Sequence, residues 1–315
     1  MDEVGPDAPA AASRMAVGSR GLAGGIDLGG TKIEARLFQG AGLATARVRR
    51  VPTPPGFDAL VAALAEQGAW LCHEAGDPAL PLGLALPGLV DPSAGTTQAA
   101  NLPGGGGPVG DALAAMMGRP VPILNDAAAF ALSEADGAAG TVVGLIIGTG
   151  LGAGVASPDG PAGWTARPLE IGHAGMPARA LARHGLPLLR CGCGREGCVE
   201  RYLSGTGIAA LAAHVLGEPL TGEVLATGDP DAGRVLAAWS DLAGDALASV
   251  LLLHPGALVL GGGLSKLPGL VGLLTDGLRR HALPGAPVPE IRLARHGDSS
   301  GARGAALLAL GHAAC

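Results

Sequence analysis

Three glycine-rich turns, each directly after a short apolar segment, constrain the fold of this chain more than any other feature. The turns lie at residues 27–32, 148–154 and 261–263. The apolar segments before them predict buried strands, and ligands of open α/β sheets bind beyond the carboxyl ends of such strands. The recurrence of strand and glycine turn therefore predicts a mixed α/β protein with two related lobes around one nucleotide.

The first turn reads DLGGTK from Asp27 to Lys32 and suits a phosphate group. Bare glycines let the backbone approach phosphate oxygens and offer N–H donors. Thr31 and Lys32 add a hydroxyl and a cation, and Asp27 is a candidate to hold Mg²⁺ through water. The alternative is an ordinary hairpin turn between strands at 24–27 and 33–38. The sequence pattern of a P-loop is not found in this segment.

The second turn reads GTGLGAG from Gly148 to Gly154 and is a second candidate phosphate cradle. A dinucleotide site needs a helix after the glycines and an acidic residue on the next strand. Here residues 155–156 continue as a strand toward a turn at 157–160, so we discount a dinucleotide site. Two cradles in one chain favour a nucleotide site over two unrelated turns.

Asn125 and Asp126 lie where a predicted strand at 121–124 meets a predicted helix at 127–135. A carboxylate at this place is often only a helix N-cap. The functional alternative is a base that orients a sugar hydroxyl or accepts its proton. Phosphoryl transfer depends mainly on positioning, and a carboxylate suits that role.

Three of the five cysteines crowd together in a glycine-rich segment, at Cys191, Cys193 and Cys198. With His173 upstream they make the donor set of a tetrahedral structural zinc site. A redox role is less favoured because the segment has no Cys-x-x-Cys pair. Cys72 and Cys315 stand alone, and this usage fits a cytoplasmic chain better than a secreted disulfide framework.

Glu170 and Glu200 flank this cluster, three residues before His173 and two after Cys198. Each by itself fits a solvated surface acid. Beside a loop held by metal, the two carboxylates would instead accept hydrogen bonds from sugar hydroxyls.

Hydrophobic periodicity predicts the remaining elements. The expected helices are 57–74, 111–117, 239–253 and 304–314, and the further strands are 47–51, 81–86, 141–147 and 257–260.

The composition argues against nucleic-acid and membrane partners. The chain has 315 residues, 48% of them hydrophobic, and a net charge of −6 with no Lys/Arg cluster to neutralise a phosphate backbone. Its apolar runs are interrupted by Gly, Pro or charge before they reach membrane-spanning length. Residues 1–20 are rich in Ala, Pro and Gly and lack the pattern of a secretory signal, so we expect a disordered tail.

Taken together and in order, these segments resemble the ROK family of repressors, open reading frames and kinases. The resemblance spans about the whole chain after Gly24, and the matching segments are DLGGTK at 27–32, LPGLVD at 86–91, NDA at 125–127, GTGLG at 148–152, EIGH at 170–173, the 191–200 stretch and GGG at 261–263. The chain departs from the family pattern at one place: many members have a polar Asn at the position of Ala128 or Ala129, where this chain has apolar alanines.

The resemblance implies an actin-like ATPase (ribonuclease H-like) fold with two lobes closing on ATP and a sugar. The small α/β lobe would comprise 21–125 and 302–315, and the large lobe 126–301 with the zinc loop. It further implies ATP, Mg²⁺ and structural Zn²⁺ as cofactors, a cytoplasmic location and a homodimer.

The resemblance also implies residue roles, with Asp126 as catalytic base. The implied sugar-binding residues are Gly88, Asn101, Asn125, Asp126, Glu170, His173 and Glu200. The implied zinc ligands are His173, Cys191, Cys193 and Cys198. The implied ATP–Mg²⁺ residues are Asp27, Gly29, Gly30, Thr31, Lys32, Gly148, Thr149, Gly150, Gly152, Gly261, Gly262 and Gly263.

Several substrates stay open at this point. The segments at 130–134 and 188–194 resemble bacterial N-acetyl-D-glucosamine kinases, whereas those at 204–207 and 296–301 resemble fructokinases. We expect phosphorylation of N-acetyl-D-glucosamine at its 6-hydroxyl, with fructose and glucose as alternatives. A sugar-responsive regulator is disfavoured because the residues before Asp27 are too few and too rich in Ala, Pro and Gly for a helix-turn-helix domain. A non-catalytic sugar-binding protein is the other alternative.

Overall fold

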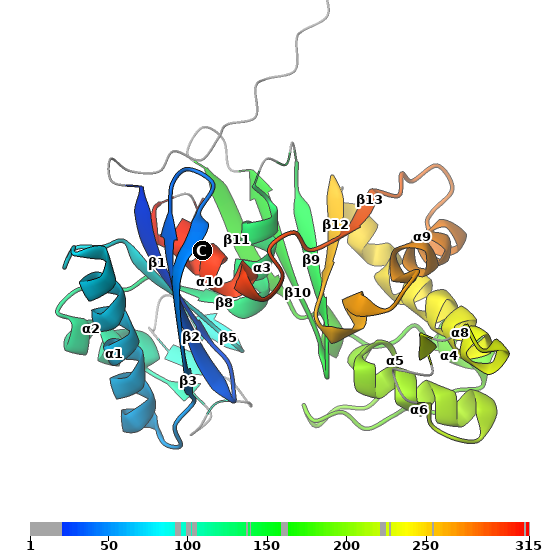
Figure 1. Ribbon diagram of the computed structural model, residues 1–315. Helices are drawn as coiled ribbons and strands as arrows, with labels where there is room; N and C mark the ends of the chain where they lie inside the picture. The colour runs from blue at the N-terminus through cyan, green and yellow to red at the C-terminus, as the bar shows by residue number, and fades with distance from the viewer. Residues whose placement is uncertain are drawn as a thin grey trace, which may run out of the picture.

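The computed structural model describes residues 21–91, 96–98, 102, 106–136, 138, 140–158, 163–220, 225–226, 228–253, 255–311 and 313–314. They form two lobes, each built on its own main β-sheet, with the N-terminal lobe in blue and cyan and the other in green to orange (Figure 1). Two helices lie between the sheets and connect the lobes.

The small-lobe sheet has the order β3-β2-β1-β4-β8. Its first three strands, β1 (Leu22–Leu28), β2 (Lys32–Gln39) and β3 (Ala44–Pro52), are antiparallel, and β4 (Leu82–Leu86) and β8 (Ile123–Asn125) continue it in parallel. Helices α1 (Phe57–Ala75) and α2 (Val109–Met117) pack together on one face of this lobe. The alternation along β2 sends Ile33, Ala35 and Leu37 into this core.

The large-lobe sheet has the order β13-β12-β9-β10-β11-β14. Its strands are β9 (Val142–Ile147), β10 (Leu151–Pro158), β11 (Trp164–Leu169), β12 (Ala257–Gly261), β13 (Glu290–Leu293) and β14 (Ala313–Ala314). Val143, Leu145 and Ile147 point into a core with the outer helices. These helices are α4 (Ala178–His184), α5 (Glu200–Leu203), α6 (Gly205–Leu216), α8 (Pro230–Leu247) and α9 (Leu270–His281).

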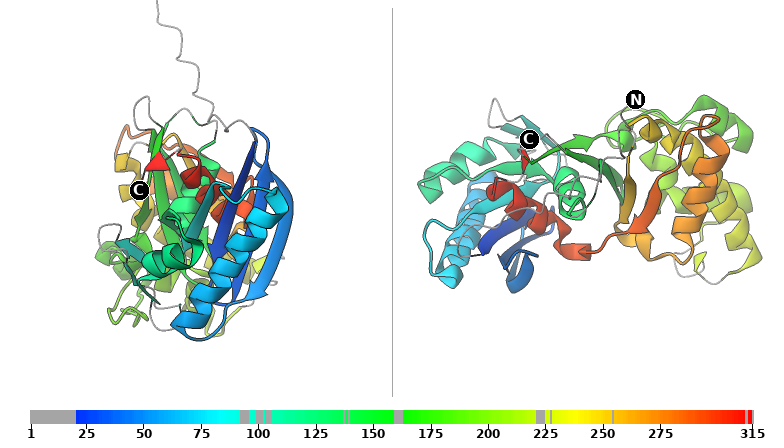
Figure 2. Two further views of the ribbon diagram at one scale, coloured as in Figure 1. Left: turned by 90° about the vertical axis from the view of Figure 1, so that its left-hand side faces the viewer. Right: turned by 90° about the horizontal axis from the view of Figure 1, so that it is seen from above.

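Helices α3 (Asp126–Glu134) and α10 (Ser300–Ala309) form the layer between the two sheets, as the right-hand view of Figure 2 shows from above. The two helices pack closely on each other and on the small-lobe sheet, because glycines at these contacts have no side chain to separate the backbones. A Cβ on Gly304 of α10 would lie 2.0 Å from the Ala129 carbonyl oxygen of α3, and one on Gly25 of β1 would lie 1.8 Å from that of Ala302. The lobes are therefore joined through two tightly packed helices.

Smaller elements complete the described chain. Strands β5 (Leu89–Asp91), β6 (Thr96–Gln98) and β7 (Gly106–Gly107) form a separate antiparallel sheet, and four short 3₁₀ helices lie in the connections. They are η3 (Ile171–His173), η4 (Ala248–Leu253), η5 (Gly263–Lys266) and η6 (Gly297–Ser299).

Most predicted elements are confirmed, with two corrections. The helix expected at 239–253 begins earlier, at Pro230, because Asp229 caps it and Pro230 suits a first turn; its last residues, 248–253, form η4 instead. The helix expected at 304–314 runs from Ser300 to Ala309, and residues 313–314 pair with β11 as a strand. The predicted lobe boundaries stay a prediction, to which the structure adds that β14 belongs to the second sheet.

One described helical stretch, Pro230–Leu253, has the length and apolar character of a membrane span. However, 67% of its most apolar part is buried inside the protein, and α8 packs against α6 and α9. This burial is typical of a core helix.

Candidate functional site

Asn125 ends strand β8 and is the N-cap of α3. Its side-chain oxygen accepts hydrogen bonds from the backbone N–H groups of Ala127 (2.9 Å) and Ala128 (3.1 Å). Its amide nitrogen donates to the Gly88 carbonyl oxygen, 2.8 Å away. One buried side chain thus ties the turn after β4 to the start of α3, and both segments border the same cavity.

Asp126 follows as the first residue of α3. Burial raises the pKa of its carboxyl group to about 6, assisted by the charge of Glu170 and opposed by the hydrogen bond from the Ala127 N–H. A carboxylate with this pKa is still ionised at pH 7 and is a stronger base than an exposed aspartate. Gly154 of β10 makes this placement possible, because a Cβ there would lie 2.1 Å from the Ala127 carbonyl oxygen.

Glu170 and His173 lie at the two ends of the short helix η3. The His173 N–H donates to the Glu170 carbonyl oxygen at 3.0 Å, which closes the turn. Gly172 allows η3 to lie against the start of β10, since a Cβ there would be 2.0 Å from the Leu151 carbonyl oxygen. Gly172 of the EIGH segment therefore allows Glu170 and His173 to lie beside the start of β10.

Glu200 is the first residue of α5 and reaches the same place from the other side. Its Oε1 accepts a hydrogen bond from the Cys191 thiol at 2.9 Å and lies 3.6 Å from His173 Nδ1. A Cβ on Gly150 would come within 3.0 Å of Oε2. Glu200 therefore lies between the second glycine turn and the cysteine cluster.

These groups surround one cavity of about 380 Å³. The structure places six of the seven predicted sugar-binding residues on its wall; Asn101 lies outside the described residues. The full lining is Pro87, Gly88, Asn125, Asp126, Ala127, Ile146, Gly148, Thr149, Gly150, Leu151, Gly152, Ala153, Leu169, Glu170, His173 and Glu200. The wall thus concentrates carboxylates, an amide, an imidazole and glycine backbone, which suits a polyhydroxylated ligand.

The four predicted metal ligands also meet. One nitrogen of His173 and the sulfurs of Cys191, Cys193 and Cys198 all lie within 4.8 Å of one another. The loop folds tightly because Gly194 and Gly197 take positive φ angles of 87° and 75°. Cys191 and Cys198 are buried, whereas Cys193 is exposed.

The chemistry of this donor set fits zinc. Burial raises the pKa of the Cys191 thiol to about 12, whereas hydrogen bonds from Arg195 lower the pKa of the Cys193 thiol to about 6. Several thiolates side by side repel one another unless a cation offsets their charge. Three sulfurs and one imidazole nitrogen at these separations are compatible with a closed tetrahedral zinc site.

The first glycine turn faces the site from the small lobe. Burial raises the pKa of Asp27 to about 7, and the next largest cause is the nearby charge of Asp126. The turn itself is held by Thr53, whose hydroxyl donates to the Gly29 carbonyl oxygen at 2.6 Å and whose N–H donates to that of Thr31 at 3.0 Å. Residues 27 and 29–32 line neither the cavity of about 380 Å³ nor the larger cavity that adjoins it. Because the charge of Asp126 helps to raise the pKa of Asp27, a cation beside Asp27 would offset the repulsion between these two carboxylates.

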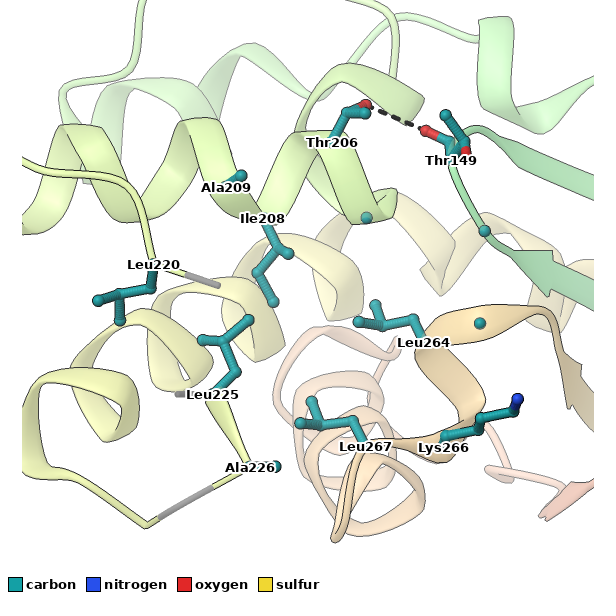
Figure 3. Close-up of a pocket in the computed structure, with 13 residues that line it drawn as sticks. Thr149, Thr206, Ile208, Ala209, Leu220, Leu225, Ala226, Leu264, Lys266 and Leu267 are labelled. Atoms are coloured by element: carbon teal, nitrogen blue, oxygen red, sulfur yellow. Dashed lines mark hydrogen bonds between the residues drawn. The ribbon is translucent and has the colours of Figure 1, made fainter. Parts of the chain in front are cut away.

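A second, larger cavity of about 710 Å³ adjoins the first, and both are lined by Gly148 and Thr149. Figure 3 shows it between the start of α6, with Thr206 and Ile208, and η5, with Leu264 and Lys266. Thr206 donates a hydrogen bond to the Thr149 carbonyl oxygen at 3.0 Å, which joins α6 to the second glycine turn. The wall is mostly apolar, so it suits a flat heterocyclic ring better than a sugar.

In the third glycine turn, two glycines serve packing and the third lines this cavity. A Cβ on Gly261 would lie 2.7 Å from the Phe130 ring, and one on Gly262 would lie 2.5 Å from the Ile147 carbonyl oxygen. Gly261 and Gly262 therefore allow β12 to pack against α3 and β9, and only Gly263 of this run lines the cavity.

Thr206 and Lys266 are site residues to which the sequence reasoning gave no role. Both line the larger cavity. The sequence contains a local signal for each of them. Thr206 belongs to the Ser-Gly-Thr-Gly stretch at 204–207, and Lys266 follows the third glycine turn.

Comparisons with known proteins agree with this geometry. Residues 23–312 match the model of the ROK family. The chain is 41% identical over 300 residues to N-acetyl-D-glucosamine kinase of Escherichia coli (strain K12), an alignment that covers 91% of this chain and 98% of that protein.

Solved structures show the same architecture. A ROK hexokinase from Thermus thermophilus is 35% identical with a TM-score of 0.75, over 91% of this chain and 97% of that one. A ROK family glucokinase from Streptomyces griseus, solved in complex with glucose and AMPPNP, is 29% identical with a TM-score of 0.70, over 91% of this chain and 99% of that one. The mixed α/β fold with two sheets is therefore the actin-like ATPase fold of these proteins.

Proposed function

Because the chain belongs to the ROK family, we propose that it is an ATP-dependent sugar kinase that phosphorylates the 6-hydroxyl of N-acetyl-D-glucosamine. The 41% identity to N-acetyl-D-glucosamine kinase over nearly the whole chain supports the choice of this sugar. The proposal also places the protein in the cytoplasm, where ATP is available, as a homodimer.

One observation carries the proposal most directly. Asp126, whose pKa is raised to about 6, opens onto a cavity whose wall also includes Glu170, His173 and Glu200. Carboxylates and an imidazole around a small cavity can each accept or donate hydrogen bonds to a different sugar hydroxyl. Asp126 would then contact the hydroxyl that reacts.

The larger cavity supplies the place for ATP. Its apolar wall, including Ile208 and Leu264, would contact the adenine ring. Gly148 and Thr149 border both cavities, so a ligand that passes this turn has one end beside the apolar wall and the other beside Asp126. The bare glycine backbone there suits the triphosphate.

Asp126 would orient the sugar hydroxyl toward the γ-phosphorus and accept its proton as the new O–P bond forms, while the bond from the γ-phosphorus to the bridging oxygen breaks and ADP leaves. The transition state of phosphoryl transfer is loose, so correct placement contributes more than deep deprotonation. Asn125 holds this arrangement, because its bonds to Gly88, Ala127 and Ala128 fix the start of α3.

Asp27 of the small lobe is the residue that would hold Mg²⁺. Its raised pKa reflects burial beside the like charge of Asp126, which a divalent cation would offset. Mg²⁺ held there with ATP would supply positive charge that offsets the charge of the phosphates. Lys32 and the glycines of the same turn are available for the phosphates.

A structural zinc ion would be held by His173, Cys191, Cys193 and Cys198. His173 also lines the smaller cavity, and Glu200 contacts Cys191. The metal would therefore fix two of the side chains that we assign to sugar binding.

The test is ADP release with Mg·ATP against a panel of N-acetyl-D-glucosamine, N-acetylmannosamine, glucose, fructose and mannose. We expect the highest kcat/KM for N-acetyl-D-glucosamine and a 6-phosphate product by phosphorus NMR. A preference for glucose or fructose would contradict the substrate. Absence of turnover on all five sugars would contradict the kinase itself.

A further inference from the structure

The chain crosses from the large lobe back to the small lobe between β13 and α10, at residues 294–299. This crossing runs along the carboxyl end of α3, the helix that begins with Asp126. The last residue of α3 is Glu134, whose side chain is fully buried at 0% exposure. The proposed mechanism gives this buried carboxylate no role.

Glu134 accepts hydrogen bonds from four residues, two within the crossing and one on either side of it. Two of the donors are backbone N–H groups, of Arg295 (3.0 Å) and His296 (3.1 Å). The other two are the Arg292 guanidinium at 3.2 Å and the Ser300 hydroxyl at 3.1 Å. A single carboxylate thus holds the end of β13, the crossing itself and the first residue of α10.

The carboxylate is charged in spite of its surroundings. Burial by itself would raise the pKa of Glu134, but the N–H groups of Arg295 and His296 and the Arg292 side chain together lower it below its ordinary value. A negative charge at a helix C-terminus opposes the helix dipole, so these donors must also offset that cost. The arrangement is therefore specific for a carboxylate.

The crossing leads directly to the Mg·ATP side of the proposed site. Gly301 follows Ser300, and a Cβ on it would lie 2.6 Å from Asp27 Oδ2. The first turn of α10 therefore packs on the Asp27 carboxyl group. Any change in how Ser300 is held would move the backbone against which Asp27 rests.

We propose that Glu134 is a positioning residue for the Mg·ATP side of the reaction, acting through the crossing segment and the start of α10 on Asp27. The inference rests on the proposed kinase function. Asp126 lies at the other end of the same helix, eight residues away and about 12 Å along its axis. The sugar cavity is formed without Glu134 or the crossing, so sugar binding is independent of this contact.

The test compares Glu134→Gln with wild type in two binding measurements that need no turnover. We expect Glu134→Gln to weaken binding of Mg·AMPPNP by about tenfold and to lower kcat, with an unchanged dissociation constant for N-acetyl-D-glucosamine. Asp136→Asn is the matched control. Asp136 lies near the same helix end and accepts from Arg303 at 2.7 Å, but its side chain is 38% exposed. The control should leave both affinities unchanged.

Equal Mg·AMPPNP affinity for wild type and Glu134→Gln would overturn the inference, as would equal losses of nucleotide and sugar affinity. If Glu134→Gln does not fold, Ser300→Ala removes one donor and keeps the carboxylate. Ser300→Ala should then weaken nucleotide binding selectively, and an unchanged affinity would overturn the inference. Failure of wild type to bind any panel sugar would count against the proposed function, whereas the nucleotide comparison would still decide the role of Glu134.

Discussion

At the scale of single residues, the site depends on Asp126, whose carboxyl group is held where its ionised form is disfavoured. Burial and the charge of Glu170 both disfavour the ionised form of Asp126, and hydrogen bonds from backbone N–H groups at the start of α3 and from the Asn125 side chain oppose them. The balance puts its pKa at about 6, between the value for an exposed aspartate and physiological pH. Asp126 is therefore ionised when the enzyme works and still basic enough to accept a proton.

This balance predicts the pH dependence of activity. Protonated Asp126 cannot accept the proton of a sugar hydroxyl. With Mg·ATP saturating, so that bound Mg²⁺ keeps Asp27 ionised, kcat/KM for the sugar should be constant above pH 7 and fall below the pKa of Asp126 of about 6. The decline should approach about tenfold per pH unit. Direct quantification of sugar phosphate from pH 5 to 8 would measure this limb. A constant kcat/KM down to pH 5 would contradict the role of Asp126.

At the scale of elements, the site is assembled from turns and helix starts. Asp126, Glu200 and Thr206 each lie in the first turn of a helix, and Gly148 and Gly263 lie just after strands. Such positions present side chains and free N–H groups outward, while the helix or strand behind them fixes their direction. The 191–198 loop is the exception, because it has no helix or strand of its own and is held by turns.

That loop gives a prediction about metal. We expect wild type to bind one zinc ion per chain and Cys198→Ser to bind none. The affinity for N-acetyl-D-glucosamine should fall by at least about tenfold in Cys198→Ser because His173 and Glu200 lose their support. Elemental analysis and calorimetric sugar titration would measure both effects. Cys72→Ser is the control, since Cys72 lies in α1 away from the cluster. Full sugar affinity in zinc-free Cys198→Ser would contradict the structural role of the metal.

The larger cavity gives a second prediction at this scale. Ala209 of α6 lines the cavity, so Ala209→Trp should fill part of it and raise the KM for ATP by about tenfold or more, with sugar affinity unchanged. Ala213 lies one turn later on the same helix and is exposed, so Ala213→Trp should leave the KM for ATP unchanged. Equal effects of the two tryptophans would argue against a nucleotide in this cavity.

Much of the element order was predictable, because short strands ended by glycine or proline leave a clear local signal. The hairpin around Gly29, the strand before Gly148 and the helix after Asn125 are examples. The β14 pairing was not predictable, since residues 313–314 become a strand only because β11 offers a free edge. The early start of α8 at Pro230 was missed although Asp-Pro is a local capping signal.

At the scale of the whole molecule, the sequence indicated which functional side chains come together, but not the packing that brings them together. The donors His173, Cys191, Cys193 and Cys198 were predictable because three thiols and one imidazole are a known ligand set of structural zinc, although their spacing is not a common one. The packing of Gly304 on Ala129, and of Gly261 on Phe130, depends on how two sheets enclose α3, which no local pattern shows. The same holds for Glu134, whose donors lie more than 150 residues further along the chain.

The central claim is that Asp126 is the base for phosphoryl transfer from ATP to a sugar hydroxyl. The most direct test measures sugar phosphate formation and sugar binding together in wild type and Asp126→Asn, a change that keeps the size of the side chain. We predict that turnover falls by about 10²- to 10⁴-fold while the dissociation constant for N-acetyl-D-glucosamine stays within about threefold of wild type. Turnover near the wild-type rate in Asp126→Asn would contradict the account.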